Sequence, residues 1–222
     1  MNNNNPNLGN DTVDHIVTTL KGSLGAIPYA GPILAELVGT TIPNQRLDRL
    51  VDYAHKLGSK LENVEEQLLT SKISKPEFAD LLEESLQQST RSLTDDRREQ
   101  IANLVTHGIT QDEIDEIQSK HFLRILGELN DIEIVLLISH SLLDRGLSAT
   151  ESEFLAKNGH LAYLVGTDSG SSQAELDQES VQNSYHIHLE GLGLLQGSVD
   201  TSFNITPIGH LLVRLIHTET VG

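Results

Sequence analysis

The chain contains no cysteine and no tryptophan, and aromatic residues make up only 4% of its 222 positions. The absence of cysteine excludes disulfides, thiolate catalysis and cysteine-ligated zinc. The shortage of aromatic side chains leaves leucine, isoleucine and valine to fill the core. Such a core favours helices, because leucine loses little rotamer freedom in a helix. The lack of cysteine also fits a reducing compartment, and we expect a cytoplasmic protein.

Basic residues are scarce as well. The 15 lysines and arginines are outnumbered by 32 aspartates and glutamates, which gives a net charge of −17. The imbalance persists in residues 122–222, where four basic side chains stand against thirteen acidic ones. A DNA-binding module needs basic residues to displace counterions from phosphates, and carboxylates repel those phosphates. We therefore expect that nucleic acid is not the partner.

The common catalytic motifs are missing too. The patterns G-x-S-x-G, G-x-x-x-x-G-K-[ST], H-E-x-x-H and G-x-G-x-x-G do not occur, and each would have indicated a particular chemistry. The closest group of titratable ligands is His186, His188 and Glu190. Two histidines alone do not make a zinc site, and an H-x-H pair on an amphipathic helix is ordinarily solvated. We predict no enzyme activity, no metal and no cofactor.

Helix start signals are frequent along the chain. Three capping boxes of the form [ST]-x-x-E, beginning at Ser74, Thr110 and Ser148, each predict the start of a helix. Thr94 and Asn130 are expected to cap two further helices. The helix after Asn130 is apolar nearly all round, so we expect it to lie at the centre of its domain.

The segment that follows Asn44 has the spacing of a heptad. Its apolar residues alternate three and four positions apart, which is the period of a helix seam. Both a coiled coil with a partner helix and an antiparallel bundle within one chain use such a seam. The bundle is favoured, because fewer than four heptads is short for a free coiled coil. The seam residues are Leu47, Leu50, Ala54, Leu57, Leu61, Val64 and Leu68.

The last hundred residues follow the element order of a winged helix. Residues 166–174 have the composition of a flexible loop, and a helix over about 175–192 is expected to end at Gly193. A short hairpin is predicted over 194–205, and Thr206 before a proline predicts the cap of the closing helix. The helix that would contact DNA has no lysine or arginine, so we expect this module to dock protein.

Residues 22–43 are strongly apolar, with Glu36 as their one charge. Three prolines interrupt the segment, and a straight membrane span needs about 20 consecutive apolar residues. Small residues four positions apart let two helices approach closely. The segment is either a buried hairpin of a soluble fold or a concealed element that engages a membrane or other copies of the chain. The residues expected at such a contact are Gly31, Leu34, Ala35, Leu37, Val38 and Gly39.

Two parts of the chain together resemble a known family. The run IPYAGPILAELVGTTIPNQRLDRL leads into a long helix, and LGELNDIEIVLLISHSLL is followed by the predicted wing and TPIGHLLVRLI. This combination resembles the Abi-alpha type of abortive-infection proteins, which are small α-helical bacterial proteins associated with phage defence. The resemblance implies a protein that acts against infected cells, by membrane damage or by binding a partner. It implies no catalytic residues.

These observations predict a mainly α protein with a short disordered tail over 1–10. We expect an N-terminal helical bundle with a heptad helix over 11–120, and a winged-helix module with a β-hairpin over 121–222. The expected function is non-enzymatic phage defence or toxicity. Residues 22–43 would engage a membrane or a second copy, and the acidic winged helix would dock a protein partner. The alternative is a winged-helix transcriptional regulator or adaptor.

Overall fold

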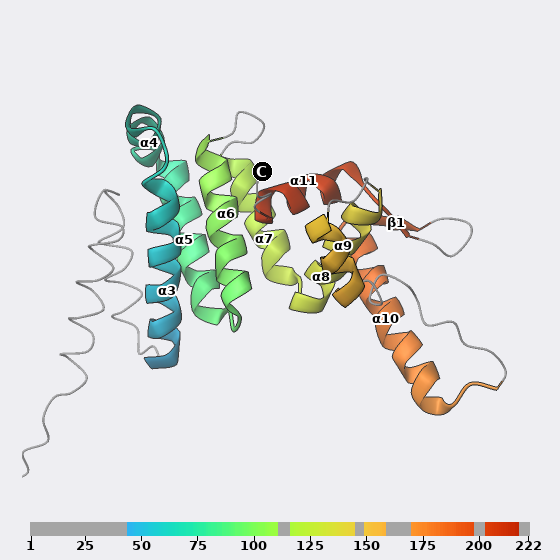
Figure 1. The fold of residues 1–222 in the computed structure, drawn as a ribbon. Coiled ribbons are helices and arrows are strands. Elements are labelled where there is room, and N and C mark those ends of the chain that lie inside the picture. The colour runs from blue at the N-terminus through green and yellow to red at the C-terminus, as the bar shows by residue number, and fades with distance from the viewer. Residues whose placement is uncertain (1–43, 111–115, 145–148, 159–169, 198–202, 218–222) are drawn as a thin grey trace, which may run out of the picture. The chain divides into compact units, whose positions relative to one another are not determined.

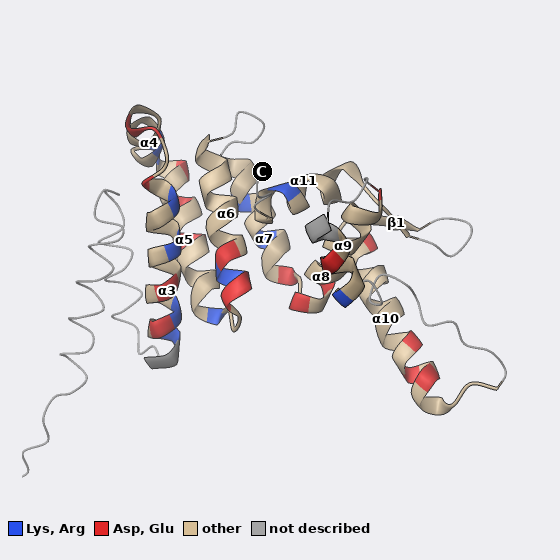
Figure 2. Ribbon diagram, in the orientation of Figure 1, with Lys and Arg blue, Asp and Glu red and all other residues tan. Residues whose placement is uncertain are grey.

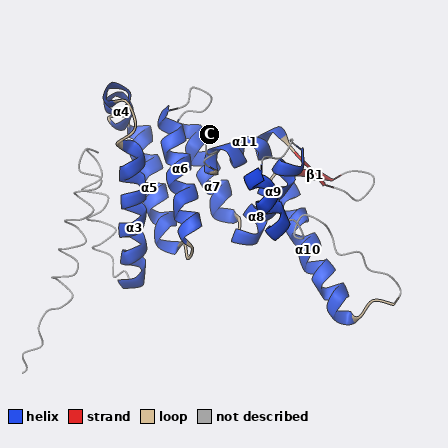
Figure 3. Cartoon of the chain, in the orientation of Figure 1, coloured by secondary structure: helices blue, strands red, loops and turns tan. Residues whose placement is uncertain are grey.

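The structure is a computed structural model that divides into two compact units, Met1–Leu126 and Gly127–Gly222. Its described part is mainly helical with one small antiparallel hairpin (Figure 3), which confirms the predicted α class. The predicted tail and the apolar segment 22–43, with its contact residues from Gly31 to Gly39, lie outside the described residues. The structure describes residues 44–110, 116–144, 149–158, 170–197 and 203–217.

Unit 1 is a bundle in which three long helices, α3, α5 and α6, pack against one another (Figure 1). The shorter α4 contacts both α5 and α6. The last helix of the unit, α7, continues for two residues past the boundary between the units. The bounds are α3 Asn44–Leu61, α4 Glu66–Ile73, α5 Pro76–Arg91, α6 Asp95–Thr110 and α7 Glu116–Glu128.

The heptad residues on α3 form part of the core of unit 1. They face α5 and α6 of the same chain, and burying a leucine side chain stabilises the fold by about 2 kcal/mol. The first five positions of the seam are buried, namely Leu47, Leu50, Ala54, Leu57 and Leu61.

The helix ends earlier than the heptad pattern does. Beyond Leu61, the backbone N–H of Asn63 donates to Lys60 O in a tighter turn, and the Asn63 side-chain amide donates to Ser59 O at 2.8 Å. The side chain thus occupies the carbonyl that the helix would have used, and α3 stops. The last two seam positions, Val64 and Leu68, are half-buried and lie beyond α3.

The capping box predicted at Ser74 is wrong. Ser74 is the C-cap of α4, and α5 begins at Pro76 with Lys75 as its N-cap residue. Proline restricts the residue before it to extended backbone, and Lys75 has φ −83° and ψ 142°. The proline itself is favoured at the first helical position. Pro76 therefore places the N-cap at Lys75, one residue after Ser74, where the serine pattern places it.

Two other predicted starts have different outcomes. Thr94 is confirmed as the cap of α6, because its Oγ1 accepts a hydrogen bond from the Arg97 backbone N–H at 3.3 Å. Thr110 is the last residue of α6, and its hydroxyl donates to Thr106 O at 3.0 Å. Its partner in the predicted capping box, Glu113, lies outside the described residues.

Among the described residues of unit 1, one buried side-chain polar atom, the Tyr53 hydroxyl, has no hydrogen-bond partner. Tyr53 is fully buried on α3, and its hydroxyl makes no hydrogen bond within the described residues. Burial raises the pKa of Tyr53, and the Ser85 hydroxyl opposes this rise. Ser85 itself donates to Leu82 O at 2.7 Å. An unsatisfied buried hydroxyl costs about 1–3 kcal/mol.

We predict that Tyr53→Phe leaves the free energy of unfolding of unit 1 unchanged or raises it by about 1 kcal/mol, because it removes a buried hydroxyl without leaving a cavity. Chemical denaturation of the full chain measures this. Tyr53→Ala is the contrasting variant and should lose about 3–5 kcal/mol through its cavity. A loss above about 1 kcal/mol in Tyr53→Phe would show that the hydroxyl has a partner in solution.

Unit 2 is arranged around α8, which contacts α9, α10, α11 and strand β2. Eight of its residues are buried, so the prediction that this helix lies at the centre of its domain is confirmed. The predicted cap at Asn130 is confirmed as well and is described below. The bounds are α8 Asp131–Asp144, α9 Ala149–Asn158, α10 Gln173–Gly191, β1 Leu195–Gly197, β2 Phe203–Ile205 and α11 Pro207–Ile216.

The hairpin after α10 and the cap of α11 are both confirmed. Strands β1 and β2 pair antiparallel, with Leu195 opposite Ile205. Gly193, at φ 73°, provides the left-handed turn between α10 and β1. The Thr206 side chain accepts a hydrogen bond from the Gly209 backbone N–H at 3.1 Å and donates to Gly193 O at 2.7 Å. This one hydroxyl therefore fixes both the start of α11 and its position against the end of α10.

The helix α10 was predicted to begin at about residue 175, but its capping box was not predicted. Ser172 and Glu175 form a complete capping box, in which the Ser172 backbone N–H donates to Glu175 Oε2 at 2.7 Å. The sequence contains this [ST]-x-x-E pattern, but it lies in a run of glycine and serine that predicted a flexible loop. The helix consequently begins at Gln173, two residues before the predicted start.

We predict that Gly209→Ala destabilises unit 2 by about 3 kcal/mol, because the new Cβ would clash with Leu194 O and would lie 2.8 Å from Ile205 Cγ1. Gly191→Ala is the matched control, since nothing lies within 4 Å of the added Cβ. The control should be unchanged or about 0.5–1 kcal/mol more stable, because alanine is the better helix former. Thermal unfolding of the full-length variants measures both. Equal stabilities would contradict the close approach of α11 to the residues flanking the hairpin.

Candidate functional site

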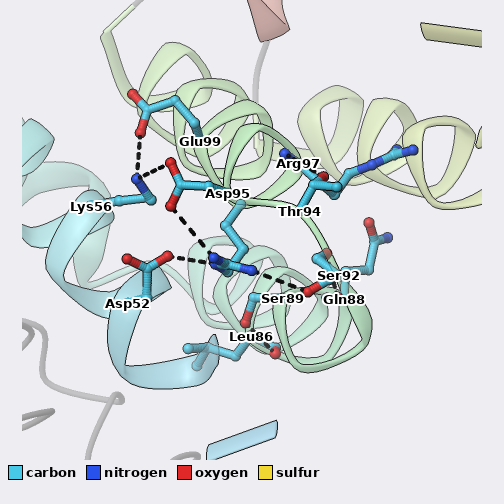
Figure 4. A network of polar contacts seen from close by, with 11 residues as sticks. Asp52, Lys56, Leu86, Gln88, Ser89, Ser92, Thr94, Asp95, Arg97 and Glu99 are labelled. Carbon is cyan, nitrogen blue, oxygen red and sulfur yellow. Dashed lines mark hydrogen bonds and ion pairs between the residues drawn. The ribbon is translucent and has the colours of Figure 1, made fainter. Parts of the chain in front are cut away.

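Two polar clusters are candidates for a site, one in each unit. The first joins α3 to α6 in unit 1 (Figure 4). Lys56 Nζ lies 3.1 Å from Asp95 Oδ2 and 3.5 Å from Glu99 Oε2, and Arg98 pairs with Asp52. Burial lowers the pKa of Lys56, but the hydrogen bond to Asp95 and the charges of Asp52, Asp95 and Glu99 outweigh burial and leave it raised. The Lys56 hydrogen bond lowers the pKa of Asp95.

Arginines in the same region satisfy the carbonyl groups at helix ends. Arg49 Nη1 donates to Thr90 O at 3.3 Å and Arg98 Nη1 donates to Ser92 O at 3.2 Å, both at the end of α5. The buried Arg97 donates to Leu126 O, in the last turn of α7, at 2.7 Å. Positive charge at a helix C-terminus is stabilising. Each cation of this cluster has a partner within the unit, so the cluster has the form of a structural connection.

The second cluster lies on α8 in unit 2. Four of its polar residues, Glu133, His140, Ser141 and Asp144, recur at helical spacing and share one side of the helix. We call them the polar face of α8. Each is hydrogen-bonded to a histidine on another element: four hydrogen bonds, grouped into three contacts with one histidine each, join the face to α10 and α11.

The central contact is between His140 on α8 and His186 on α10, which we call the histidine pair. Their Nε2 atoms lie 3.3 Å apart, with the rings edge to face. His186 is only 1% exposed, and its ring lies 4.6 Å from that of Phe203 on β2, centroid to centroid. Burial and, to a smaller extent, the neighbouring His186 lower the pKa of His140 to about 4. His140 is therefore neutral at neutral pH.

The tautomer of each ring follows from the geometry. His186 Nδ1 lies 2.9 Å from Gln182 O, and a carbonyl oxygen can only accept, so Nδ1 of His186 bears the proton. In a neutral ring the other nitrogen, Nε2, is then an acceptor. His140 must donate to it from its own Nε2. One hydrogen bond between the two rings thus links α8 to α10.

A second contact holds the other end of the polar face. Glu133 is 3% exposed, and its Oε2 accepts from the Asn130 backbone N–H at 2.8 Å. The Glu133 N–H donates in return to Asn130 Oδ1 at 2.9 Å, which confirms the predicted reciprocal cap. The remaining oxygen, Oε1, accepts from His188 Nδ1 at 2.7 Å. A carboxylate recruited as a helix cap therefore also binds α10.

The third contact has the composition of a nucleophilic triad. Ser141 Oγ lies 3.1 Å from His210 Nδ1, and His210 Nε2 lies 3.0 Å from Asp144 Oδ2. In serine hydrolases the serine is accessible and the aspartate is buried. Here the exposure of the two residues is the reverse, because Ser141 is 1% exposed and the Asp144 side chain is 67% exposed. The arrangement ties α11 to α8 and leaves no access for a substrate at Ser141 Oγ.

Sequence reasoning found only part of this cluster. His186 and His188 were expected to be a solvated pair, and this is wrong for His186, which is buried under Phe203. The apolar character of α8 hid the role of His140 and Ser141. Their partners lie 46 and 69 positions away, and no local pattern indicates such pairings. Only the Asn130–Glu133 cap was visible as a motif.

Two further properties bear on the predicted site residues and on metal. The residues expected at a membrane or oligomer contact lie outside the described part, and no helix within the described part is both long and apolar enough to cross a membrane. Among the described residues, no group of three or more His, Asp or Glu side chains is placed to hold a metal ion. Comparison with known proteins gives no family model, no curated protein and no solved structure that matches the chain.

We predict that Glu133→Ala destabilises unit 2 by about 2 kcal/mol, because the Asn130 N–H and His188 Nδ1 both lose an acceptor. His188→Ala should cost less, and the double variant should cost less than the sum of the two, since both remove the same hydrogen bond. Denaturant melts of the four proteins form the cycle. Glu128→Gln, at an exposed position, is the control. Fully additive losses would contradict the Glu133–His188 contact.

Proposed function

We propose that this is a non-enzymatic protein-binding protein in which unit 2 is a winged-helix-type docking module. The observation that supports this is the character of α10, the helix that would contact DNA in such a module. The helix contains Glu175, Asp177, Glu179 and Glu190 but no lysine or arginine (Figure 2). A phosphate backbone repels a helix of this charge, so a protein is the better partner for its surface.

The order of the elements in unit 2 supports the winged-helix assignment. In the described part of unit 2, helices α8, α9 and α10 precede the two-stranded hairpin and the closing helix α11. The third helix and the hairpin are the parts that winged-helix proteins present to a partner. In this chain the third helix is well defined at both ends, by the Ser172 capping box and by the turn at Gly193.

The exposed side chains of α10 support a docking role. Residues 173–178 are all exposed, and Figure 1 shows this half extending away from the other helices of unit 2. Leu176 is 38% exposed and Ile187 is 56% exposed. They are about three helical turns apart and lie on one side of the helix. Apolar residues on an otherwise polar, exposed helix are suited to contact another protein.

The defence role remains part of the proposal on the strength of the resemblance to Abi-alpha proteins. In that role a bacterial cytoplasmic protein docks a partner through unit 2, and residues 22–43 engage a membrane or a second copy. The second candidate is a transcriptional regulator or adaptor. The same element order supports it, and the charge of α10 opposes it.

We predict that Leu176→Gln together with Ile187→Gln abolishes protection of bacteria against phage while the circular dichroism spectrum is unchanged. Glutamine keeps helix propensity and removes the apolar contact. Ile132→Gln on α8, at 42% exposure, is the matched control and should keep full protection. Plating efficiency of phage on cells that express each full-length protein measures the effect. Full protection by the α10 variant would refute the docking proposal. No protection by the wild type would refute the defence role.

A DNA-binding assay separates the two candidates. The docking proposal expects that the full chain has no sequence-specific affinity for duplex DNA at any salt concentration. A regulator would bind specifically, and its affinity would fall steeply as salt rises, because bound counterions are released. Selection from a random duplex library, followed by titration at two salt concentrations, measures this. Specific, salt-sensitive binding would make the regulator the better assignment.

A further inference from the structure

The histidine pair is a contact between α8 and α10 that proton uptake weakens. A proton added to His186 goes to Nε2, because Nδ1 already bears one, and the hydrogen bond of the pair then re-forms only if His140 moves its own proton to Nδ1 and accepts at Nε2. A proton added to His140 goes to Nδ1 and places a charge where the side chain is largely buried. Either event leaves a positive charge on a buried ring, and the loss of its solvation opposes the packed arrangement.

Among the described residues, no carboxylate is hydrogen-bonded to His140 or His186, and Glu190, four positions after His186 on α10, accepts from the Gly197 N–H. The acidic residues of the polar face of α8 are engaged elsewhere, since Glu133 pairs with His188 of α10 and Asp144 with His210 of α11. Strand β2 presents the apolar ring of Phe203 to His186. The charged residues of α9 that the structure describes, Glu153 and Lys157, are exposed. The titratable group that faces His140 is therefore His186.

The other two histidine contacts respond to acid in the opposite way. His188 and His210 each donate to a carboxylate, at 2.7 and 3.0 Å. Protonation of either ring keeps the hydrogen bond and adds an ion pair. Protonation of His188 favours the attachment of α10, but the His188 side chain is 42% exposed and solvent screens the gain. A charge on the buried histidine pair is not screened in this way, so the pair determines how mild acid affects the attachment of α10.

From this geometry we propose that the histidine pair is an acid-sensitive connection, through which proton uptake below about pH 6 releases α10 and the hairpin from α8. Release would uncover Leu189, which is fully buried on α10, and the ring of Phe203. The consequence is a pH-regulated exposure of the apolar underside of α10. The proposal does not depend on which partner unit 2 binds.

The direction of the pH dependence follows from comparing the two states. In the packed state the pKa of His140 is lowered to about 4, whereas a released, solvated imidazole has its ordinary value of about 6.5. Above pH 6.5 both states are neutral, and attachment is fully favourable. Between pH 6.5 and 4 only the released state takes up the proton, so each pH unit favours release by up to about tenfold. Attachment is thus lost as the pH falls.

The test is amide hydrogen exchange on the full chain, read by mass spectrometry for peptides of α10, at pH 7.5 and 5 and corrected for intrinsic exchange. We expect the protection of residues 182–191 in wild type to fall by roughly tenfold or more, from the linkage above. The variant His140→Gln retains an N–H donor for His186 but takes up no proton. It should keep its protection at pH 5, and His121→Gln, at an exposed position of unit 1, should behave as wild type.

Equal loss of protection in wild type and His140→Gln would overturn the proposal. If the variant fails to fold at pH 7.5, the histidine ring signals of the wild-type protein decide the question by NMR. The His140 ring should become protonated only as α10 loses its protection, and the exposed His121 serves as an internal reference in the same spectrum. A His140 ring that is already protonated at pH 5.5 while α10 remains protected would refute the proposal.

Discussion

The packing of unit 2 depends on hydrogen bonds to the polar groups that are buried on its apolar central helix, α8. Helix α8 is the centre of the unit, yet Glu133, Ser139 and Ser141 are buried on it. A buried polar group without a partner costs about 1–3 kcal/mol. Ser139 returns its hydroxyl to Val135 O on its own helix, whereas Glu133 and Ser141 are satisfied by histidines of α10 and α11. The desolvation of α8 therefore determines where the neighbouring helices are held.

Histidine suits this task because it can donate at one nitrogen and accept at the other. His186 bonds a carbonyl of its own helix and the ring of His140. His210 in the same way joins a serine and an aspartate. The consequence is that packing in unit 2 responds to protons, which a core of leucine and valine alone would not do. In the proposed acid response, the imidazole rings that join α8 to α10 are also the groups that take up the proton.

Unit 1 solves a similar problem with arginine. The carbonyls at the end of α5 accept from Arg49 and Arg98, and one at the end of α7 accepts from Arg97. Guanidinium groups stay charged across the physiological range, so these contacts are insensitive to pH. The ion pairs between α3 and α6 are partly exposed, and such pairs are worth roughly 0–1 kcal/mol each. The stability of unit 1 therefore comes mainly from its buried apolar face.

The sequence by itself determined the helical class, the apolar face of α3, the caps at Thr94, Asn130 and Thr206, and the hairpin before α11. These features arise from side chains that act within a few positions of themselves, so spacing reveals them. Local patterns misjudged Ser74, because the proline two positions later restricts the backbone more strongly than a serine cap does. Only the tertiary structure decided that His186 is buried and that His140, Glu133 and Ser141 find partners on α10 and α11. Those pairings join residues 46 to 69 positions apart, and they exist only because the folded chain brings these helices together.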